Sequence, residues 1–324
     1  MLVACHTFNI QPHSRSGQFI VSLGTNKDLD NIRGLSYYKE SVRRTNNKKG
    51  VAEKMLKLSV AHTADADDAF MFYGMMNGKV AKGFEINNII EDIETLNRKA
   101  FGTVHDVTAV SAHAYALLRE KYRILSAGAS VGDGYAPVIV AKKETALEGK
   151  KIATPGRLTT ANLLLRLAID DFQPVEMRFD EITKAVQTGK ADAGLLIHEG
   201  QISYSRHGLV KVFDFWDWWD VKTGLPLPLG LNVIKRDLPE GLQREFLDVM
   251  RSSIKYALEN VEEALEYAMR YSRGEDRELI RKFTLMYVND YTYEMPEPVR
   301  KALGMLYEMG EEKGLLKAPP LDIL

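Results

Sequence analysis

The chain of 324 residues is 45% hydrophobic and 27% charged, which is typical of a folded globular protein and excludes a disordered or fibrous one. Its 43 Lys and Arg residues nearly balance its 44 Asp and Glu residues, so the net charge of −1 provides no field that would gather nucleic acid or an anionic membrane. The length predicts about two domains, and no apolar run reaches the length of a membrane span. We therefore expect a cytoplasmic protein, monomer or homodimer, that acts on a small molecule and has no nucleic-acid or membrane partner.

The N-terminal part of the chain differs from the rest in charge. Residues 1–57 contain ten Lys and Arg residues against four Asp and Glu residues, whereas the remainder contains 33 against 40. This stretch has no sustained period of 3.6 or 2 residues. We predict that residues 1–55 form a basic, poorly ordered N-terminal extension, either a mobile arm or sequence upstream of the true start, because Met55 opens the first periodic segment. The single cysteine, Cys5, cannot form an internal disulfide.

From Leu56 onward, strand and helix patterns alternate. Apolar, β-favouring runs predict strands at 57–62, 106–110, 136–141, 151–154, 175–179, 191–198 and 227–234. Helical periodicity predicts helices at 69–77, 112–119, 159–168 and 181–188, and then at 240–259, 261–272, 275–290 and 297–312. Asp67 or Asp68 is expected to cap the first of these helices. The alternation predicts an α/β fold with mostly parallel sheets, and the last four helices predict a helical C-terminal cap.

The order of the strands also predicts two lobes. If the strand at 136–141 leaves a first lobe and the strand at 227–234 returns to it, lobe 1 comprises residues 56–141 and 232–324, and lobe 2 comprises residues 142–231. Two α/β lobes joined by two connections enclose a cleft, and ligand sites preferentially lie in such clefts.

Polar residues at the carboxyl ends of the predicted strands are the candidates for a site, because ligands bind there in parallel sheets. His198 ends an apolar strand, where its imidazole could transfer protons near neutral pH or could be purely structural. Thr159 and Thr160 follow a Pro-Gly turn, so this helix start could bind an anion with Arg157 beside it. Alternatively, the threonines only cap the helix.

The remaining polar cluster is the acidic triplet Asp65, Asp67 and Asp68. Its oxygens could bind a divalent ion, but helix capping is the interpretation we favour, because carboxylates on one turn rarely converge without other ligands. No metal is therefore expected. No dinucleotide-binding loop, P-loop or zinc spacing is convincing either, so we expect no cofactor.

Five segments, taken together in order and spacing, resemble those of the 1,4-dihydroxy-6-naphthoate synthases of the futalosine route to menaquinone. They are residues 106–115 (DVTAVSAHAY), 155–161 (PGRLTTA), 193–199 (AGLLIHE), 223–230 (TGLPLPLG) and 287–292 (YVNDYT). The resemblance runs from about Leu56 to the C-terminal helices and does not cover the N-terminal extension.

The resemblance implies a two-lobed fold similar to type II periplasmic binding proteins. It also implies a carbon-carbon lyase that converts cyclic dehypoxanthine futalosine to 1,4-dihydroxy-6-naphthoate with release of dihydroxyacetone, without a redox cofactor. The family's proton acceptor falls on His198. Its substrate contacts fall on the segment Ala109, Val110 and Ser111 and on the pair Thr159 and Thr160, and Asp68 retains an acidic residue of the family.

Three departures from the family pattern leave other functions open. The family usually reads Pro-Asn-Asp-Thr-Phe where this chain has residues 66–70 (ADDAF), which keeps the second acid but loses the Asn amide and the Thr hydroxyl. Ala109 stands where the family often has Lys, and Asn162 stands where it frequently has His. The alternatives are a non-catalytic solute-binding protein of the same fold for a small carboxylated or aromatic ligand, and the chorismate dehydratase that shares the fold. The matches at 197–199 and 225–228 favour the synthase.

Overall fold

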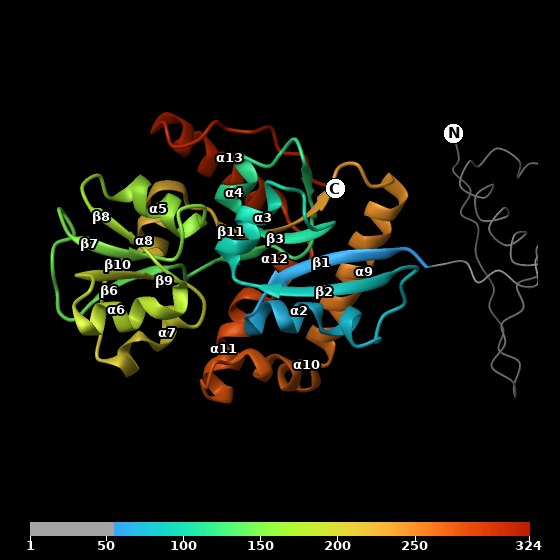
Figure 1. Ribbon diagram of the computed structural model, residues 1–324, viewed down its shortest axis with the longest axis horizontal. Helices are drawn as coiled ribbons and strands as arrows, with labels where there is room; N and C mark the ends of the chain where they lie inside the picture. Colours follow the sequence, from blue (N-terminus) through green and yellow to red (C-terminus); the bar gives the residue numbers. More distant parts are fainter. Residues whose placement is uncertain (1–54) are drawn as a thin grey trace, which may run out of the picture. The chain divides into compact units, whose positions relative to one another are not determined.

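Two β-sheets organise the chain in a computed structural model that describes residues 55–324 (Figure 1). The first sheet has six strands in the order β2-β1-β3-β11-β4, with β5 beside β11, and the second has five in the order β10-β6-β9-β7-β8. The predicted N-terminal extension lies outside the described residues. Each sheet belongs to one α/β lobe, so the two-lobed α/β fold predicted from the sequence is confirmed.

The first sheet is parallel on one side and antiparallel on the other. Strand β1 pairs in parallel with β2 and with β3, whereas β11 runs antiparallel to β3, β4 and β5. Its strands are β1 (Lys57–Thr63), β2 (Glu85–Glu91), β3 (Val107–Ser111), β4 (Tyr122–Ile124), β5 (Ser130–Gly132) and β11 (Leu227–Lys235). The helices that follow its parallel strands are α2 (Ala66–Met76), α3 (Ile93–Ala100) and α4 (Ala112–Ala116). The parallel strands end at one edge of the sheet, at Thr63 and Ser111.

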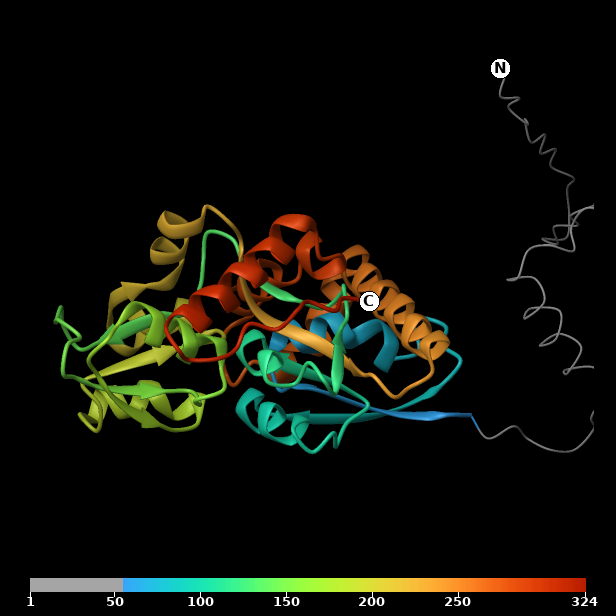
Figure 2. The same cartoon turned by 90° about the horizontal axis from the view of Figure 1, so that it is seen from above.

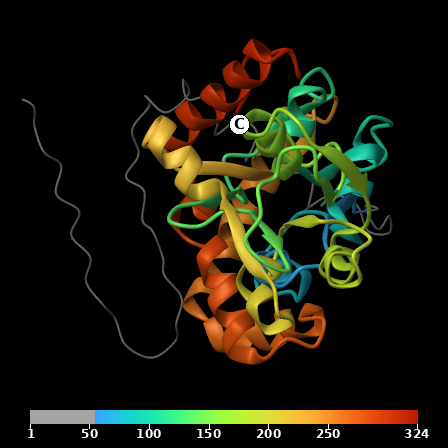
Figure 3. The ribbon, with the colours of Figure 1, turned by 90° about the vertical axis from the view of Figure 1, so that its left-hand side faces the viewer.

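The second sheet is also mixed, and it belongs to the lobe that is nearest the viewer in Figure 3. Strand β7 pairs in parallel with β8 and β9, and β6 pairs antiparallel with β9 and β10. Its strands are β6 (Val138–Ala141), β7 (Lys151–Thr154), β8 (Gln173–Glu176), β9 (Ala193–Leu196) and β10 (Val210–Asp214). The helices of this lobe are α5 (Thr160–Ala168), α6 (Ile182–Thr188), α7 (Gly200–Ser203) and α8 (Phe215–Thr223), with the 3₁₀ helices η1 (Phe179–Glu181) and η2 (Tyr204–His207).

The C-terminal segment is helical, as predicted. It comprises α9 (Glu240–Glu259), α10 (Val261–Ala268), η3 (Met269–Tyr271), α11 (Arg277–Tyr287), α12 (Asp290–Tyr293) and α13 (Glu297–Glu312). Helices α9, α10 and α11 pack on α2. Helix α13 contacts β11 and α4 of the first lobe and α5 of the second lobe, and it overlies α5 in Figure 2. Within residues 55–324, no helix is both long and apolar enough to cross a membrane.

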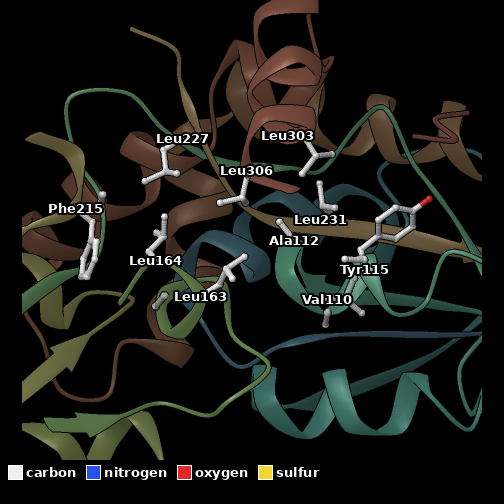
Figure 4. Packing of buried hydrophobic residues seen from close by; sticks show 14 of the residues in the cluster. Val110, Ala112, Tyr115, Leu163, Leu164, Phe215, Leu227, Leu231, Leu303 and Leu306 are labelled. Atoms are coloured by element: carbon white, nitrogen blue, oxygen red, sulfur yellow. The ribbon is translucent and has the colours of Figure 1, made fainter. Parts of the chain in front are cut away.

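The largest buried cluster draws side chains from both lobes (Figure 4). Val110 of β3 and Leu231 of β11 are fully or almost fully buried, as are Leu163 of α5 and Leu306 of α13. Burying one such side chain contributes about 1.5–3 kcal/mol relative to leaving it exposed. The cluster therefore holds the first turn of α5, and the residues that precede it, next to the end of β3.

The structure corrects several details of the sequence analysis. The sheets are mixed, and the strand at 136–141, which we assigned to lobe 1, lies in the second sheet as β6. The connections between the sheets therefore precede Val138 and Leu227, because an equally apolar strand fits either sheet and its sequence does not specify a partner. Asp65, and neither Asp67 nor Asp68, occupies the N-cap position of α2, and its side chain makes no capping hydrogen bond.

We predict that Gly194 in β9 is required by packing against α6. A Cβ atom at Gly194 would lie 2.6 Å from Ile182 Cγ2 and 2.8 Å from Val186 Cγ2. Gly194→Ala should therefore lower the free energy of unfolding by about 1–3 kcal/mol and lower the melting temperature in calorimetry. The control is Gly304→Ala in α13, where nothing lies within 4 Å of the added atom. This change should stabilise the protein by up to about 1 kcal/mol, and equal melting temperatures for the two variants would contradict the packing argument.

Candidate active site

A cavity lies where the carboxyl ends of strands from both sheets meet. It contains about 690 Å³ of space free of protein atoms, part of it open to solvent. The first lobe lines it with residues after β1, at the end of β3 and along β11, and the second lobe with the first turn of α5 and the residues after β9. Tyr287 and Phe283 of α11 also line it.

The cavity brings together all but one of the site residues predicted from the sequence. Its lining includes Asp68, Ala109, Val110, Ser111, Thr159, Thr160 and His198. The exception is Arg157, whose side chain is exposed and does not line the cavity. Contact of the lining residues with a substrate stays a prediction.

His198 lies two residues beyond the end of β9 in a left-handed backbone conformation, with φ of 56°. Its Nδ1 atom lies 2.9 Å from Asp65 Oδ2, and its ring contacts Phe179 edge to face. Its Nε2 atom is buried and has no hydrogen-bond partner within residues 55–324. When Nδ1 carries the proton beside this carboxylate, the lone pair lies on Nε2, so Nε2 is the ring atom that can accept a proton.

Arg273 connects the residues around His198 across the two lobes. Its guanidinium donates to both carboxylate oxygens of Glu199, each at 2.7 Å, and to Asp65 Oδ1 at 2.6 Å. It also donates to the carbonyl of Ala64 at 2.6 Å. Glu199 follows β9 in the second lobe and Asp65 follows β1 in the first, so one side chain joins the two strand ends. The backbone of Arg273 also adopts a left-handed conformation, with φ of 52°.

These contacts determine the protonation states of Asp65 and His198. Burial raises the pKa of Asp65, but the charges of His198 and Arg273 and their hydrogen bonds outweigh burial and hold that pKa well below its usual range. Burial lowers the pKa of His198, whereas the charge and hydrogen bond of Asp65, with contributions from Asp67 and Glu199, raise it above its ordinary value. The site therefore contains an ionised carboxylate that stabilises the protonated imidazole.

The two carboxylates that follow Asp65 in α2 differ in their partners. Asp68 Oδ2 accepts hydrogen bonds from the backbone N–H of Thr63 at 2.7 Å and from the Thr63 hydroxyl at 2.6 Å. Asp67 Oδ1 is buried without a partner among the described residues. No group of three or more His, Cys, Asp or Glu side chains in the described part of the chain could hold a metal ion.

The hydroxyls of Thr159 and Thr160 are engaged within the protein. Thr159 caps α5 by accepting from the N–H of Asn162 at 3.2 Å, and it donates to the carbonyl of Gly156 at 2.8 Å. Thr160 donates to the carbonyl of Leu229 in β11 at 2.6 Å. The Asn162 N–H is thus already paired, and the helix start keeps its anion-binding character through the N–H groups of Thr160 and Ala161, which lack intrahelical acceptors.

Sequence reasoning missed Arg273, Gln201 and Tyr287. The Tyr287 hydroxyl donates to the side-chain oxygen of Gln201 at 2.8 Å, and both residues line the cavity. Arg273 is 208 residues from Asp65 in the chain and lies in a loop between helices. No local pattern connects such distant residues, whereas His198, at the end of an apolar strand, carries a local signal.

Comparisons with known proteins place the chain among enzymes of one biosynthetic route. A model of the menaquinone-biosynthesis protein family matches residues 58–312. A 1,4-dihydroxy-6-naphthoate synthase from Thermus thermophilus is 40% identical over 255 residues, covering 78% of this chain and 94% of the relative. A second protein of that name, from Streptomyces coelicolor, is 31% identical over 274 residues, covering 82% of this chain and 97% of its own length.

Solved structures agree on the fold. A crystal structure of a protein from Archaeoglobus fulgidus, 66% identical, superposes with a TM-score of 0.79 over 80% of this chain and 98% of its own. A Candida albicans protein described as having the generic periplasmic-binding-protein fold, 14% identical, superposes with a TM-score of 0.62 over 82% of this chain and 92% of its own. The chain thus has the periplasmic-binding-protein-like fold and belongs to the menaquinone-biosynthesis family.

Proposed function

We propose that this protein is a carbon-carbon lyase that converts cyclic dehypoxanthine futalosine to 1,4-dihydroxy-6-naphthoate and releases dihydroxyacetone. Family membership and the names of the two curated relatives support this activity. The observation that carries the proposal is the buried Nε2 atom of His198, which has no partner among the described residues and belongs to a residue that lines the cavity. A solute-binding protein of the same fold would need neither a base nor a carboxylate that orients it.

His198 acts as the general base in this proposal. Its Nε2 atom removes a proton from the polyhydroxylated substrate ring, and the carboxylate of Asp65 stabilises the imidazolium that forms. Retro-aldol cleavage of a carbon-carbon bond then yields the aromatic naphthalenediol, and aromatisation drives the step. The protein therefore has to supply a base, hydrogen bonds for developing oxyanions, and a site from which water is excluded.

The first turn of α5 and the end of β3 supply the remaining contacts. The substrate carboxylate binds at the N-terminus of α5, where backbone N–H groups and the helix dipole favour an anion. Because both threonine hydroxyls are engaged in the protein, we assign carboxylate recognition to these N–H groups. At the end of β3, the Ser111 hydroxyl accepts from the Asn97 amide at 3.0 Å, which leaves its own hydrogen to donate to the substrate.

We predict that His198→Asn removes most of the turnover without unfolding the protein. Asn adopts left-handed backbone conformations more readily than most residues, so it suits the φ of 56° at this position. Loss of a positioned base should lower kcat by about 10²- to 10⁴-fold. Naphthoate formation measures the effect, and circular dichroism checks the fold.

The matched control is His207→Asn, because the His207 side chain is exposed. This control should keep the parental kcat. A His198→Asn enzyme with near-parental kcat would rule out the base assignment.

A second prediction concerns Asp65 and the pH dependence of the rate. The Asp65 carboxylate stabilises protonated His198, so Asp65→Asn should lower the pKa of His198 and keep the imidazole neutral to lower pH. The acidic limb of the kcat/KM profile should move to lower pH, and kcat should fall at least about tenfold because the ring loses its orienting acceptor.

The control is Asp180→Asn, which removes an exposed carboxylate that pairs with Arg178. It should leave the acidic limb in place. A limb that stays in place in Asp65→Asn as well would mean that a group other than His198 titrates there.

A further inference from the structure

Asp67 is a buried acid that the reaction outlined above does not use. It is the second residue of α2, its side chain lines the cavity, and the residue is only 6% exposed. Its Oδ1 atom is buried and has no hydrogen-bond partner within residues 55–324. An unpaired polar atom in such a place costs free energy unless a ligand satisfies it.

The neighbours of Asp67 disfavour its charged form. Burial, followed by the nearby charges of Asp68 and Asp65, raises the pKa of Asp67 to about 8. Five charged or titratable side chains interact with Asp67. Two come from the start of α2 and one follows β9, and the others are tyrosines of the β5–β6 connection and of α11: Asp65, Asp68, His198, Tyr135 and Tyr287. Only His198 among them favours ionised Asp67.

The proton of the adjacent pair is assigned by hydrogen bonding. Asp68 accepts two hydrogen bonds from Thr63, and donors of this kind stabilise an ionised carboxylate. Burial raises the pKa of Asp68 as well, but the charge of His62 and the two Thr63 hydrogen bonds oppose that rise. Asp67 has only a backbone hydrogen bond from Asp68 and no donor on Oδ1 among the described residues, so we assign the proton of the pair to Asp67. A protonated carboxylic acid has one O–H donor, so neutral Asp67 can donate a hydrogen bond into the cavity.

We propose that Asp67 works as a neutral carboxylic acid that donates a hydrogen bond to a carbonyl or phenolate oxygen of the substrate ring. The acid donates its O–H without transferring the proton. This proposal rests on the proposed function for the identity of the ligand. It deepens that function by making Asp67 a substrate-binding residue. Asp67 must be protonated at a pH at which His198 is not.

This requirement gives the enzyme a bell-shaped pH profile. His198 accepts a proton only when it is neutral, above its own pKa, and Asp67 donates only when it is protonated, below about pH 8. Activity should therefore fall on the alkaline side as Asp67 ionises. Ionised Asp67 would also repel the oxyanion that develops on the ring.

Two substitutions of Asp67 distinguish the effect of its hydrogen-bond donor from the effect of its titration. Asp67→Asn keeps a donor that does not titrate, so the alkaline limb of kcat/KM should disappear and kcat/KM at pH 7 should change by less than about tenfold. Asp67→Leu keeps the branching but has no donor, so kcat/KM should fall by at least about tenfold at every pH. The control Asp217→Asn makes the same chemical change on an exposed residue of α8 and should keep the parental profile. An alkaline limb that persists in Asp67→Asn would overturn the proposal.

Infrared spectroscopy tests the protonation state without any turnover. The parent minus Asp67→Asn difference spectrum at pH 7 should contain the C=O stretch of a protonated carboxylic acid, which should vanish above about pH 8. Addition of 1,4-dihydroxy-6-naphthoate should shift this band, because the acid donates to the bound ring. Absence of the band, or a band that the naphthoate does not shift, would overturn the proposal. If the parent protein makes no naphthoate from the futalosine substrate, the lyase assignment fails, and these spectra still decide the role of Asp67.

Discussion

The contact between Arg273 and two carboxylates is the interaction on which the rest of the site depends. Arg273 pairs with Glu199 after β9 and with Asp65 after β1, so it fixes the distance between strand ends that belong to different sheets. Asp65 in turn holds Nδ1 of His198, whose backbone comes from the second lobe. The proposed base is thus oriented by a residue of the opposite lobe. Because the two carboxylates are buried, while the Arg273 side chain is 26% exposed, their attraction is screened less by solvent than that of a fully exposed ion pair.

Neighbouring carboxylates in α2 show how position decides protonation. Asp65 faces two cationic groups and is ionised, whereas Asp67, two residues later, faces mainly acids and buried surface. A carboxylate and a neutral carboxylic acid within one helical turn can perform different tasks: one stabilises a cation and the other donates a hydrogen bond. A carboxylic acid at position 67 can therefore donate a hydrogen bond as an amide would, but only at a pH at which it is protonated.

The sequence predicted those features of the fold that local patterns encode. The strands at β1, β7 and β11 and the long helices α9 and α13 follow from apolar runs and helical periodicity, and the ends of such elements placed His198 and Ser111. The sheet to which β6 belongs was missed, since four apolar residues pack equally well in either sheet. Arg273 was missed for a different reason, because an ion pair across 208 residues depends on tertiary structure alone. Arg157 had the right chemistry but lies on the exposed side of its turn.

The left-handed backbone conformations of His198 and Arg273 place backbone strain at the contacts that join the two lobes. Among the described residues, only one other non-glycine residue, Thr103, has a positive φ. Each such conformation costs on the order of 1–2 kcal/mol and persists because surrounding contacts outweigh it. At both residues those contacts join the two lobes, so the ion pairs that connect the lobes also hold the strained backbone. The strain offsets part of the free energy that these ion pairs contribute, so they hold the lobes together less strongly than the same pairs would on a relaxed backbone.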